Sequence, residues 1–267
     1  MQDPQTTIAL GDATATIRHR GAQVVSWRHG GCAQLFVSER AVRDDRTPLR
    51  GGIPIIFPQF GARGPGRRHG FARTATWTRT ALSPDRAAFA LGAAPVDAGW
   101  PHDTLASLEV ALHDAGRRLA VALTVENAGS APVAFTSALH TYLAIDLAGG
   151  VTLPELADRD WRDSREATDT PLRRDALHFG PEVDRLYPDA PATVTLTEAG
   201  RPRLQIGMSG FTDIVVWNPG ATLAATLADL GEEAASRFVC VEPAAAERPV
   251  RMAPGGVWRG VQSLTIV

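Results

Sequence analysis

The chain has 267 residues, of which 44% are hydrophobic and 21% charged, a composition typical of a folded globular protein. Its formal net charge of -2 argues against general nucleic-acid binding, and no run of about 18 apolar residues predicts a membrane-spanning helix. The first residues show no signal-peptide pattern. The only two cysteines, Cys32 and Cys240, do not make a disulfide framework, so we expect a reducing, cytoplasmic location.

Short segments with strand character follow one another along most of the chain. The clearest pair spans residues 105–113 and 117–126, where Leu119, Val121 and Leu123 alternate with smaller or polar residues. That period of two is typical of a half-buried strand. Further strands are expected at residues 6–10, 13–19, 22–28, 34–38, 74–81, 86–91, 133–139, 193–197, 204–208, 213–217, 237–241 and 257–267.

Helical character is confined to one stretch, residues 221–230. Residues 153–192 have no strong period, so we expect long loops with short strands there. Short strands at regular spacing with turn signals predict an all-β sandwich or barrel. Because no repeat, linker or low-complexity tract interrupts the chain, we expect a single domain over residues 1–267.

Residues 50–73 are the least ordinary stretch. Their apolar run, residues 53–60, contains Pro54 and Pro58, which lack backbone donors, so an irregular buried segment is expected instead of a central strand. Cationic side chains surround this run: Arg50, Arg63, Arg67, Arg68, His69 and Arg73. Because the chain has no lysine, the use of arginine here says nothing about a preference for arginine over lysine. The clustering of these cations is still informative, and it predicts a pocket for a small anion. A glycine-rich loop with solvated arginines explains the same pattern equally well.

Three further side chains with acid–base chemistry stand where predicted strands begin or end. His140 follows an apolar strand, Glu242 follows another, and Asp213 opens a third. A carboxylate at the end of an apolar strand needs a partner or a shifted pKa. Taken singly, each has a plain structural explanation: a satisfied core histidine, a strand-end cap and a turn residue.

Five motifs together are more specific. They are Arg-Gly-Gly-Ile-Pro from Arg50, His-Gly-Phe-Ala-Arg from His69, His-Thr-Tyr from His140, Trp-Asn-Pro from Trp217 and Val-Cys-Val-Glu-Pro from Val239. In this order they resemble the hexose-6-phosphate mutarotases (glucose-6-phosphate 1-epimerases) of the aldose 1-epimerase superfamily, from about residue 23 to the C-terminus. The resemblance implies a large antiparallel β-sandwich of the galactose mutarotase type, with a shallow sugar site on one sheet and a cofactor-free reaction.

The resemblance also implies roles for individual residues. His140 matches the general acid and Glu242 the general base of a ring-opening reaction. Ordinary pKa values near ~6.5 and ~4.3 make imidazolium and carboxylate partly available near neutral pH.

Substrate-binding roles are implied in the same way. His69 and Asp213 match positions that hold the sugar, whereas Arg50 and Arg73 are expected to face the phosphate or the ring hydroxyls. The sequence departs from the family pattern at Gly220, where relatives often carry tryptophan, which puts substrate preference in question more than chemistry.

Two other functions stay open: an epimerase for unphosphorylated aldoses and a non-catalytic carbohydrate-binding sandwich. The aromatic content of 6% weighs against the second, because such modules usually hold sugars with exposed aromatic rings. We expect the protein to bind a small sugar phosphate and neither nucleic acid nor a membrane. We also expect it to be a monomer. Seven scattered histidines with no close pair at zinc spacing predict no metal site. Cys240, two residues from Glu242 on a probable strand, is expected to be a small buried residue beside the site.

Overall fold

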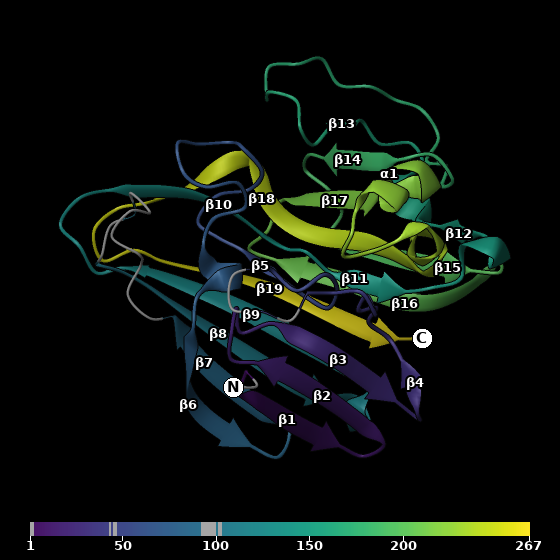
Figure 1. The fold of residues 1–267 in the computed structure, drawn as a ribbon. Coiled ribbons are helices and arrows are strands. Elements are labelled where there is room, and N and C mark those ends of the chain that lie inside the picture. The colour runs from purple at the N-terminus through teal and green to yellow at the C-terminus, as the bar shows by residue number, and fades with distance from the viewer. Residues whose placement is uncertain (1–2, 43, 45–46, 92–99, 101–102) are drawn as a thin grey trace.

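The computed structural model describes residues 3–42, 44, 47–91, 100 and 103–267, whose strands form three antiparallel sheets (Figure 1). The eight-stranded sheet has the order β12 (Val151–Thr152), β15 (Thr193–Glu198), β16 (Arg201–Ser209), β19 (Val257–Ile266), β9 (Arg118–Asn127), β8 (Thr104–His113), β7 (Arg86–Leu91) and β6 (Trp77–Ser83). The seven-stranded sheet has the order β13 (Arg162–Asp163), β14 (Val183–Tyr187), β17 (Asp213–Asn218), β18 (Phe238–Met252), β10 (Val133–Leu139) and β5 (Ile55–Ile56), with β11 (Tyr142–Ala144) also paired to β18.

A smaller sheet and a few helical turns complete the fold. The four-stranded sheet has the order β1 (Gln5–Leu10), β2 (Ala13–Arg18), β3 (Val24–His29) and β4 (Cys32–Ala33). The helical elements are α1 (Gly220–Thr226) and the 3-10 turns η1 (Ala72–Thr74), η3 (Asp114–Gly116), η4 (Leu147–Gly149), η5 (Pro154–Leu156) and η6 (Glu232–Arg237). No helix among the described residues is both long and apolar enough to cross a membrane.

The two large sheets pack face to face around the main core. Ile214 and Val216 of β17 and Val241 of β18 belong to that core, together with buried residues of β8, β9, β16 and β19. Because successive side chains of a strand point to opposite faces, the residues between them, including Val215 and Glu242, point to the outer face of the seven-stranded sheet. The outer face of this sheet is therefore where the chain presents its unusual side chains.

The predicted all-β antiparallel sandwich is confirmed, and the clearest predicted pair forms β8 and β9. The predicted helix is shorter than expected, ending at Thr226. The strand predicted at residues 34–38 is wrong, because its backbone groups bond to several different elements. Leu35 and Val37 form only isolated bridges, and the N–H of Phe36 donates to the carbonyl of Tyr142.

Strand β18 is much longer than predicted. It continues through Pro243, which pairs with Ile214, instead of ending before Glu242. On the side of β10 and β11, the ladder pairs Ala244 and Cys240 but none of residues 241–243, so Pro243 occupies a gap in the ladder. The ladder to β10 shifts register between Phe135 and Ser137, so β18 bulges farther on, between Ala245 and Val250. Glu242 therefore lies within a strand, paired with Val215 of β17, and does not cap a strand end.

The irregular buried segment at residues 53–60 is confirmed. Only Ile55–Ile56 forms a strand, and Ile53 and Phe57 are also buried. The chain then turns back at Gly70, whose φ is +64° and where an added Cβ would lie 2.0 Å from the carbonyl oxygen of Phe57. A glycine is required at this close approach, which fixes the path of the residues that follow.

Candidate active site

A cavity of about 500 Å³ opens on the outer face of the seven-stranded sheet. Strands β17 and β18 supply its floor, and residues 47–73, the 164–165 loop and the end of α1 supply its walls. The polar and aromatic residues that line it are Thr47, Arg50, Phe60, Arg68, His69, Arg73, His140, Tyr142, Ser164, Arg165, Glu182, Asp184, Trp217, Asp229 and Glu242.

His140 and Glu242 lie side by side in this cavity, with Nδ1 of His140 3.2 Å from Oε1 of Glu242. His140 follows β10 directly, and its backbone N–H donates to the carbonyl of Pro54. Glu242 lies opposite Val215 in the β17–β18 ladder. The carboxylate is 1% exposed, whereas 14% of the imidazole side chain reaches solvent. Two strands thus hold a proton donor and a proton acceptor in contact.

Burial shifts the two pKa values of this pair in opposite directions. Burial lowers the pKa of His140 well below its ordinary value, and the cationic side chains around the ring add to the effect. Burial raises the pKa of Glu242 well above its ordinary value, and the nearby Asp184 carboxylate adds to it. In the ligand-free protein these shifts favour neutral imidazole with carboxylic acid over the ion pair expected from ordinary pKa values. Together the two groups then hold one acidic proton, on the carboxyl group of Glu242.

Aromatic rings fix the orientation of the imidazole. The ring of Tyr142 stacks on His140 at a centroid distance of 4.8 Å and an interplanar angle of 8°. Trp217 meets the same imidazole edge-on, at 5.8 Å and 83°. With one ring parallel and one perpendicular, the imidazole has little freedom to rotate, so its nitrogen atoms keep their directions.

Three arginines of the cavity form what we term the arginine rim: Arg50, Arg68 and Arg73. Arg50 remains charged but has a partner, since its guanidinium lies 3.0 Å from Asp229 and also donates to the hydroxyl of Tyr142. Arg68 and Arg73 have no carboxylate within ion-pair distance among the residues that the structure describes. Burial lowers the pKa of Arg73 to about 10, and the neighbouring arginines add to this. The rim therefore holds positive charge that an anion would neutralise.

His69 lies in the cavity wall, with its ring centroid 6.2 Å from that of His140. Its backbone has a φ of 62°, and its Nδ1 accepts a hydrogen bond from the N–H of Gly61 at 3.4 Å. Burial lowers its pKa to about 3, and the positive charges of Arg73, Arg68 and Arg50 add to the effect. His69 is thus a neutral imidazole that both lines the cavity and holds the preceding loop.

The structure places Asp213 outside the cavity lining. It is fully buried, and its Oδ2 accepts hydrogen bonds from the backbone N–H groups of Ala246 and Glu247, each at 2.8 Å. Its Oδ1 accepts from the hydroxyl of Thr212. Both oxygens are occupied where β18 bulges, and Asp213 does not line the cavity, so the sugar-binding role expected of it has no support from the cavity lining.

Asp184 lines the cavity instead, and sequence reasoning missed it. It lies on β14, opposite Trp217 in the ladder to β17, in the region expected to be mostly loop. The hydroxyl of Ser164 donates to its carboxylate, and burial raises its pKa to about 6. The apolar residues Val183, Leu186 and Tyr187 were the available signal, but they do not alternate along the strand and so do not stand out among loop residues.

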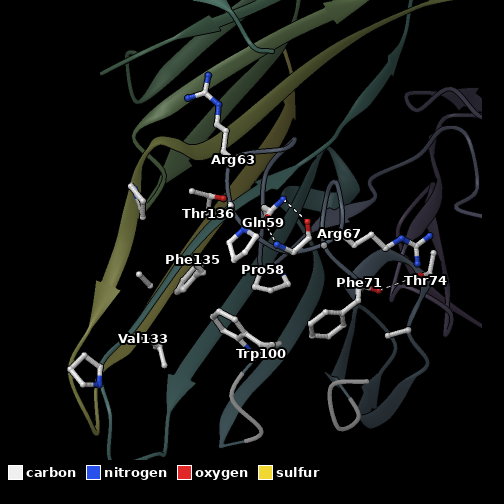
Figure 2. Close-up of a pocket in the computed structure, with 18 residues that line it drawn as sticks. Pro58, Gln59, Arg63, Arg67, Phe71, Thr74, Trp100, Val133, Phe135 and Thr136 are labelled. Atoms are coloured by element: carbon white, nitrogen blue, oxygen red, sulfur yellow. Dashed lines mark hydrogen bonds between the residues drawn. The ribbon is translucent and has the colours of Figure 1, made fainter. Parts of the chain in front are cut away.

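A second cavity, of about 710 Å³, borders the same segment and has a different chemical character (Figure 2). Of the described residues that line it, none is a histidine or a carboxylate, and rings such as Trp100 and Phe135 dominate. The side chain of Gln59 bonds both backbone groups of Gly66, which folds the intervening loop. Figure 2 shows Arg63 extending away from the rings, and it lies 3.5 Å from Glu247.

Acid–base groups and unpaired cations therefore meet only in the smaller of these two cavities, as far as the described residues show. Arg63, one of the clustered arginines, is committed to the structure: it also donates to the carbonyls of Ser164 and Glu166. This ties the 164–166 loop, which carries part of the cavity wall, to the arginine-rich segment.

Known proteins with similar sequences and structures share this architecture. A protein of Cenchrus ciliaris, provisionally named glucose-6-phosphate 1-epimerase, is 34% identical over 92% of this chain and 79% of its own length. A protein of Escherichia coli K12 with the same provisional name is 30% identical over 86% of this chain and 79% of its own. The crystal structure of a Salmonella typhimurium protein, provisionally described as a mutarotase, has a TM-score of 0.83 at 26% identity, covering 98% of this chain and 90% of that one. The family model described as aldose 1-epimerase matches residues 4–265, and the chain belongs to this family.

Proposed function

We propose that this protein interconverts the α and β anomers of a hexose 6-phosphate, with glucose 6-phosphate as the first candidate. The observation that carries the proposal is the meeting, in one cavity, of the His140–Glu242 pair and the arginine rim. Family membership supports the reaction class, and the names of the relatives point to a phosphorylated sugar. A sugar phosphate carries about -1.5 to -2 charges at pH 7, which complements the rim.

The chemistry requires one proton to leave one oxygen and one proton to reach another. In the proposed direction, Glu242 takes the proton of the anomeric hydroxyl while His140 gives a proton to the ring oxygen. The bond between C1 and the ring oxygen breaks, its electron pair stays on that oxygen, and C1 becomes an aldehyde. Rotation about C1–C2 presents the other face of the aldehyde, and the reverse proton transfers close the ring. The pair ends with the proton count it began with.

Phosphate binding would prepare His140 for its role. In the ligand-free protein, cations including Arg50 and Arg73 help to hold the imidazole neutral. A bound phosphate neutralises part of that positive charge, so the pKa of His140 rises toward the range in which an imidazolium can donate. The rim thereby selects a phosphorylated substrate and also favours the proton arrangement that ring opening needs.

The remaining polar groups of the cavity suit sugar hydroxyls. Asp184 presents a carboxylate that accepts hydrogen bonds, and His69 presents a neutral imidazole. We assign both to holding the ring, whereas Arg50, Arg68 and Arg73 are assigned to the phosphate.

The decisive experiment compares anomer exchange of glucose 6-phosphate and of glucose by NMR saturation transfer, with and without the protein. We expect strong acceleration for the phosphate ester and little for glucose. Equal acceleration of both sugars would retain the acid–base pair but favour an epimerase of unphosphorylated aldoses. If neither sugar exchanges faster, the protein is better explained as a carbohydrate-binding sandwich.

A variant tests the phosphate site separately. Arg73→Ala should raise KM for glucose 6-phosphate by about ten- to a hundredfold, the worth of a charged hydrogen bond, while kcat changes little. Arg86→Ala, on the exposed surface of β7, is the matched control and should leave both constants unchanged. A fall in kcat without a rise in KM would show that Arg73 acts on the chemical step instead.

We further propose that the protein acts as a monomer in the cytoplasm. All residues assigned to the site come from one chain, and both cysteines are free thiols, which suits a reducing compartment. Light scattering on the purified protein should give a mass near the 28.4 kDa of one chain. Twice that mass would contradict the monomer.

A further inference from the structure

The outer face of the seven-stranded sheet carries one reactive group that the proposed reaction does not use. Cys240 is two residues before Glu242 on β18, so both side chains point to the same face. In the ladders, Cys240 lies between Tyr142 of β11 and Trp217 of β17, and its side chain is fully buried. The thiol is thus placed directly beside the acid–base pair.

Three different ligand types converge at this point. A ring nitrogen of His140, the Sγ of Cys240 and a carboxylate oxygen of Glu242 all lie within 4.8 Å of one another. Imidazole, thiolate and carboxylate are the three side-chain ligands that zinc takes in proteins. They are far apart in the sequence, at residues 140, 240 and 242, so the short ligand spacing of sequence motifs could not reveal them.

Two of these groups also have binding capacity that the protein leaves unused. Nδ1 of His140 faces Glu242 but makes no hydrogen bond of good geometry, and Oε2 of Glu242 has no hydrogen-bond partner among the described residues. Both atoms are buried. Buried polar atoms without partners are uncommon, and a bound ion is one of the arrangements that satisfies them.

We propose that His140, Cys240 and Glu242 form a binding site for a divalent cation of the zinc class, and that the ion inhibits the enzyme. Zinc bonds of about 2.0–2.3 Å require ligand atoms that lie up to 4.8 Å apart to approach one another by roughly 1 Å, which rotation of the Cys240 and Glu242 side chains can supply without turning the imidazole. Because His140 and Glu242 line the cavity, the ion would reach its ligands from that side. Magnesium and calcium, which prefer oxygen ligands, do not fit this ligand set.

Binding would exchange protons for the ion. Cys240 loses its thiol proton, and the His140–Glu242 pair loses its one acidic proton, so both protons leave to solvent as the ion enters. The imidazole then has no proton to give, and the carboxylate cannot take one. Inhibition therefore rests on the proposed function, whereas metal binding does not.

Cobalt(II) provides a test that does not depend on activity. The exposed Cys32 is first replaced in a Cys32→Ser background, so that Cys240 is the only thiol. Titration with cobalt should give one equivalent of tight binding and a near-ultraviolet thiolate-to-metal absorption band. In the same background, Cys240→Ala should abolish the band and weaken zinc affinity, measured by competition with a chromogenic chelator, by at least about tenfold.

The effect on catalysis is measured in the same proteins. Zinc should inhibit anomer exchange in the Cys32→Ser protein but much less in Cys32→Ser/Cys240→Ala, and magnesium should inhibit neither. Absence of the thiolate band from the Cys32→Ser protein would overturn the site. This outcome does not depend on whether the Cys32→Ser/Cys240→Ala protein folds. Equal inhibition of both proteins by zinc would place the inhibitory ion elsewhere. If neither protein catalyses exchange but the band appears, the metal site stands and the proposed function fails.

Discussion

The contact between His140 and Glu242 leads to the first prediction at the scale of single residues. His140→Asn and Glu242→Gln should each lower kcat by about a hundred- to ten-thousandfold, the usual contribution of one positioned acid or base. Both replacements keep a similar shape and remove the ability to exchange a proton. Anomer exchange measured by NMR, together with circular dichroism and thermal unfolding, separates lost chemistry from lost folding.

Matched controls are available for both substitutions. His178→Asn and Glu126→Gln change exposed residues of the same types and should leave kcat unchanged. If either His140→Asn or Glu242→Gln kept full activity in a folded protein, the role given to that residue would be wrong.

The buried carboxyl of Asp184 makes the folded protein respond to pH. Its pKa is raised to about 6 by burial, whereas an unfolded Asp titrates near ~3.9. Between these values the folded state binds more protons than the unfolded state, so the contribution of Asp184 to stability falls as pH rises through this window. Above about pH 6 the ionised carboxylate is disfavoured in the fold by up to roughly 3 kcal/mol, as two pKa units imply.

Asp184→Asn removes that ionisation and should therefore stabilise the protein only above the window. We expect urea denaturation to give similar free energies of unfolding for both proteins near pH 4, and a more stable variant at pH 7 to 8. Activity should fall in the variant, since the carboxylate is assigned to the sugar. A stability difference that is independent of pH would show that the carboxyl does not titrate in this range.

At the scale of elements, the β18 bulge depends on Asp213. Asp213→Ala leaves the buried N–H groups of Ala246 and Glu247 without an acceptor, which should destabilise the protein by about 2–4 kcal/mol. Because Asp213 does not line the cavity, KM for glucose 6-phosphate should change little at a temperature where the variant is folded. Denaturant unfolding and steady-state kinetics measure the two effects. A large rise in KM with unchanged stability would restore Asp213 to sugar binding.

Asp213 also shows what sequence patterns can predict about a site. Period-two alternation correctly places it on the same face as Val215 and Trp217, which do line the cavity. Alternation does not predict how far along the strand the cavity extends. Asp213 lies just past the cavity, where its carboxylate accepts hydrogen bonds from the backbone of the β18 bulge. Asp184 pairs with Trp217 in the β14–β17 ladder, so its side chain points to the same face of the sheet. This register depends on pairing between distant segments, which local sequence patterns do not contain, so the position of Asp184 could not be predicted.

The elements themselves were predictable to different degrees. Long alternating strands such as β8 and β9 were found because their period is local. The extension of β18 past Pro243 was not, because a proline argues against a strand, and the gap between β10 and β11 that leaves residues 241–243 without ladder partners on that side depends on long-range pairing. The irregular segment at residues 53–60 was predicted by its prolines.

At the scale of the whole molecule, the sandwich followed from the strand series, but the protonation of the site did not. Ordinary pKa values predict imidazolium and carboxylate, whereas burial under strands, aromatic rings and arginines favours the neutral pair. Depth of burial arises only when segments more than 100 residues apart pack together, as residue 140 does with residue 242. For the same reason the convergence of Cys240 with this pair was visible only in the fold.

The arginine rim connects substrate binding to the stability of the whole fold. A ligand that binds only the folded state stabilises it by about 2.7 kcal/mol at a hundred times its Kd. For a chain of this size that corresponds to a rise in Tm of roughly 5–10 °C. Glucose 6-phosphate should produce this shift, whereas glucose at the same concentration should produce almost none, because the rim contributes most of the selectivity.

The rim variant locates the source of that shift. Arg73→Ala should lose most of the rise in Tm caused by glucose 6-phosphate, while Arg86→Ala should keep it. Sodium sulfate at matched ionic strength corrects for general anion effects on stability. Equal shifts with glucose and its 6-phosphate would mean that the sugar ring alone supplies the binding energy. The positive charge of the arginine rim would then affect the stability of the fold and the pKa of His140 but would not select the substrate.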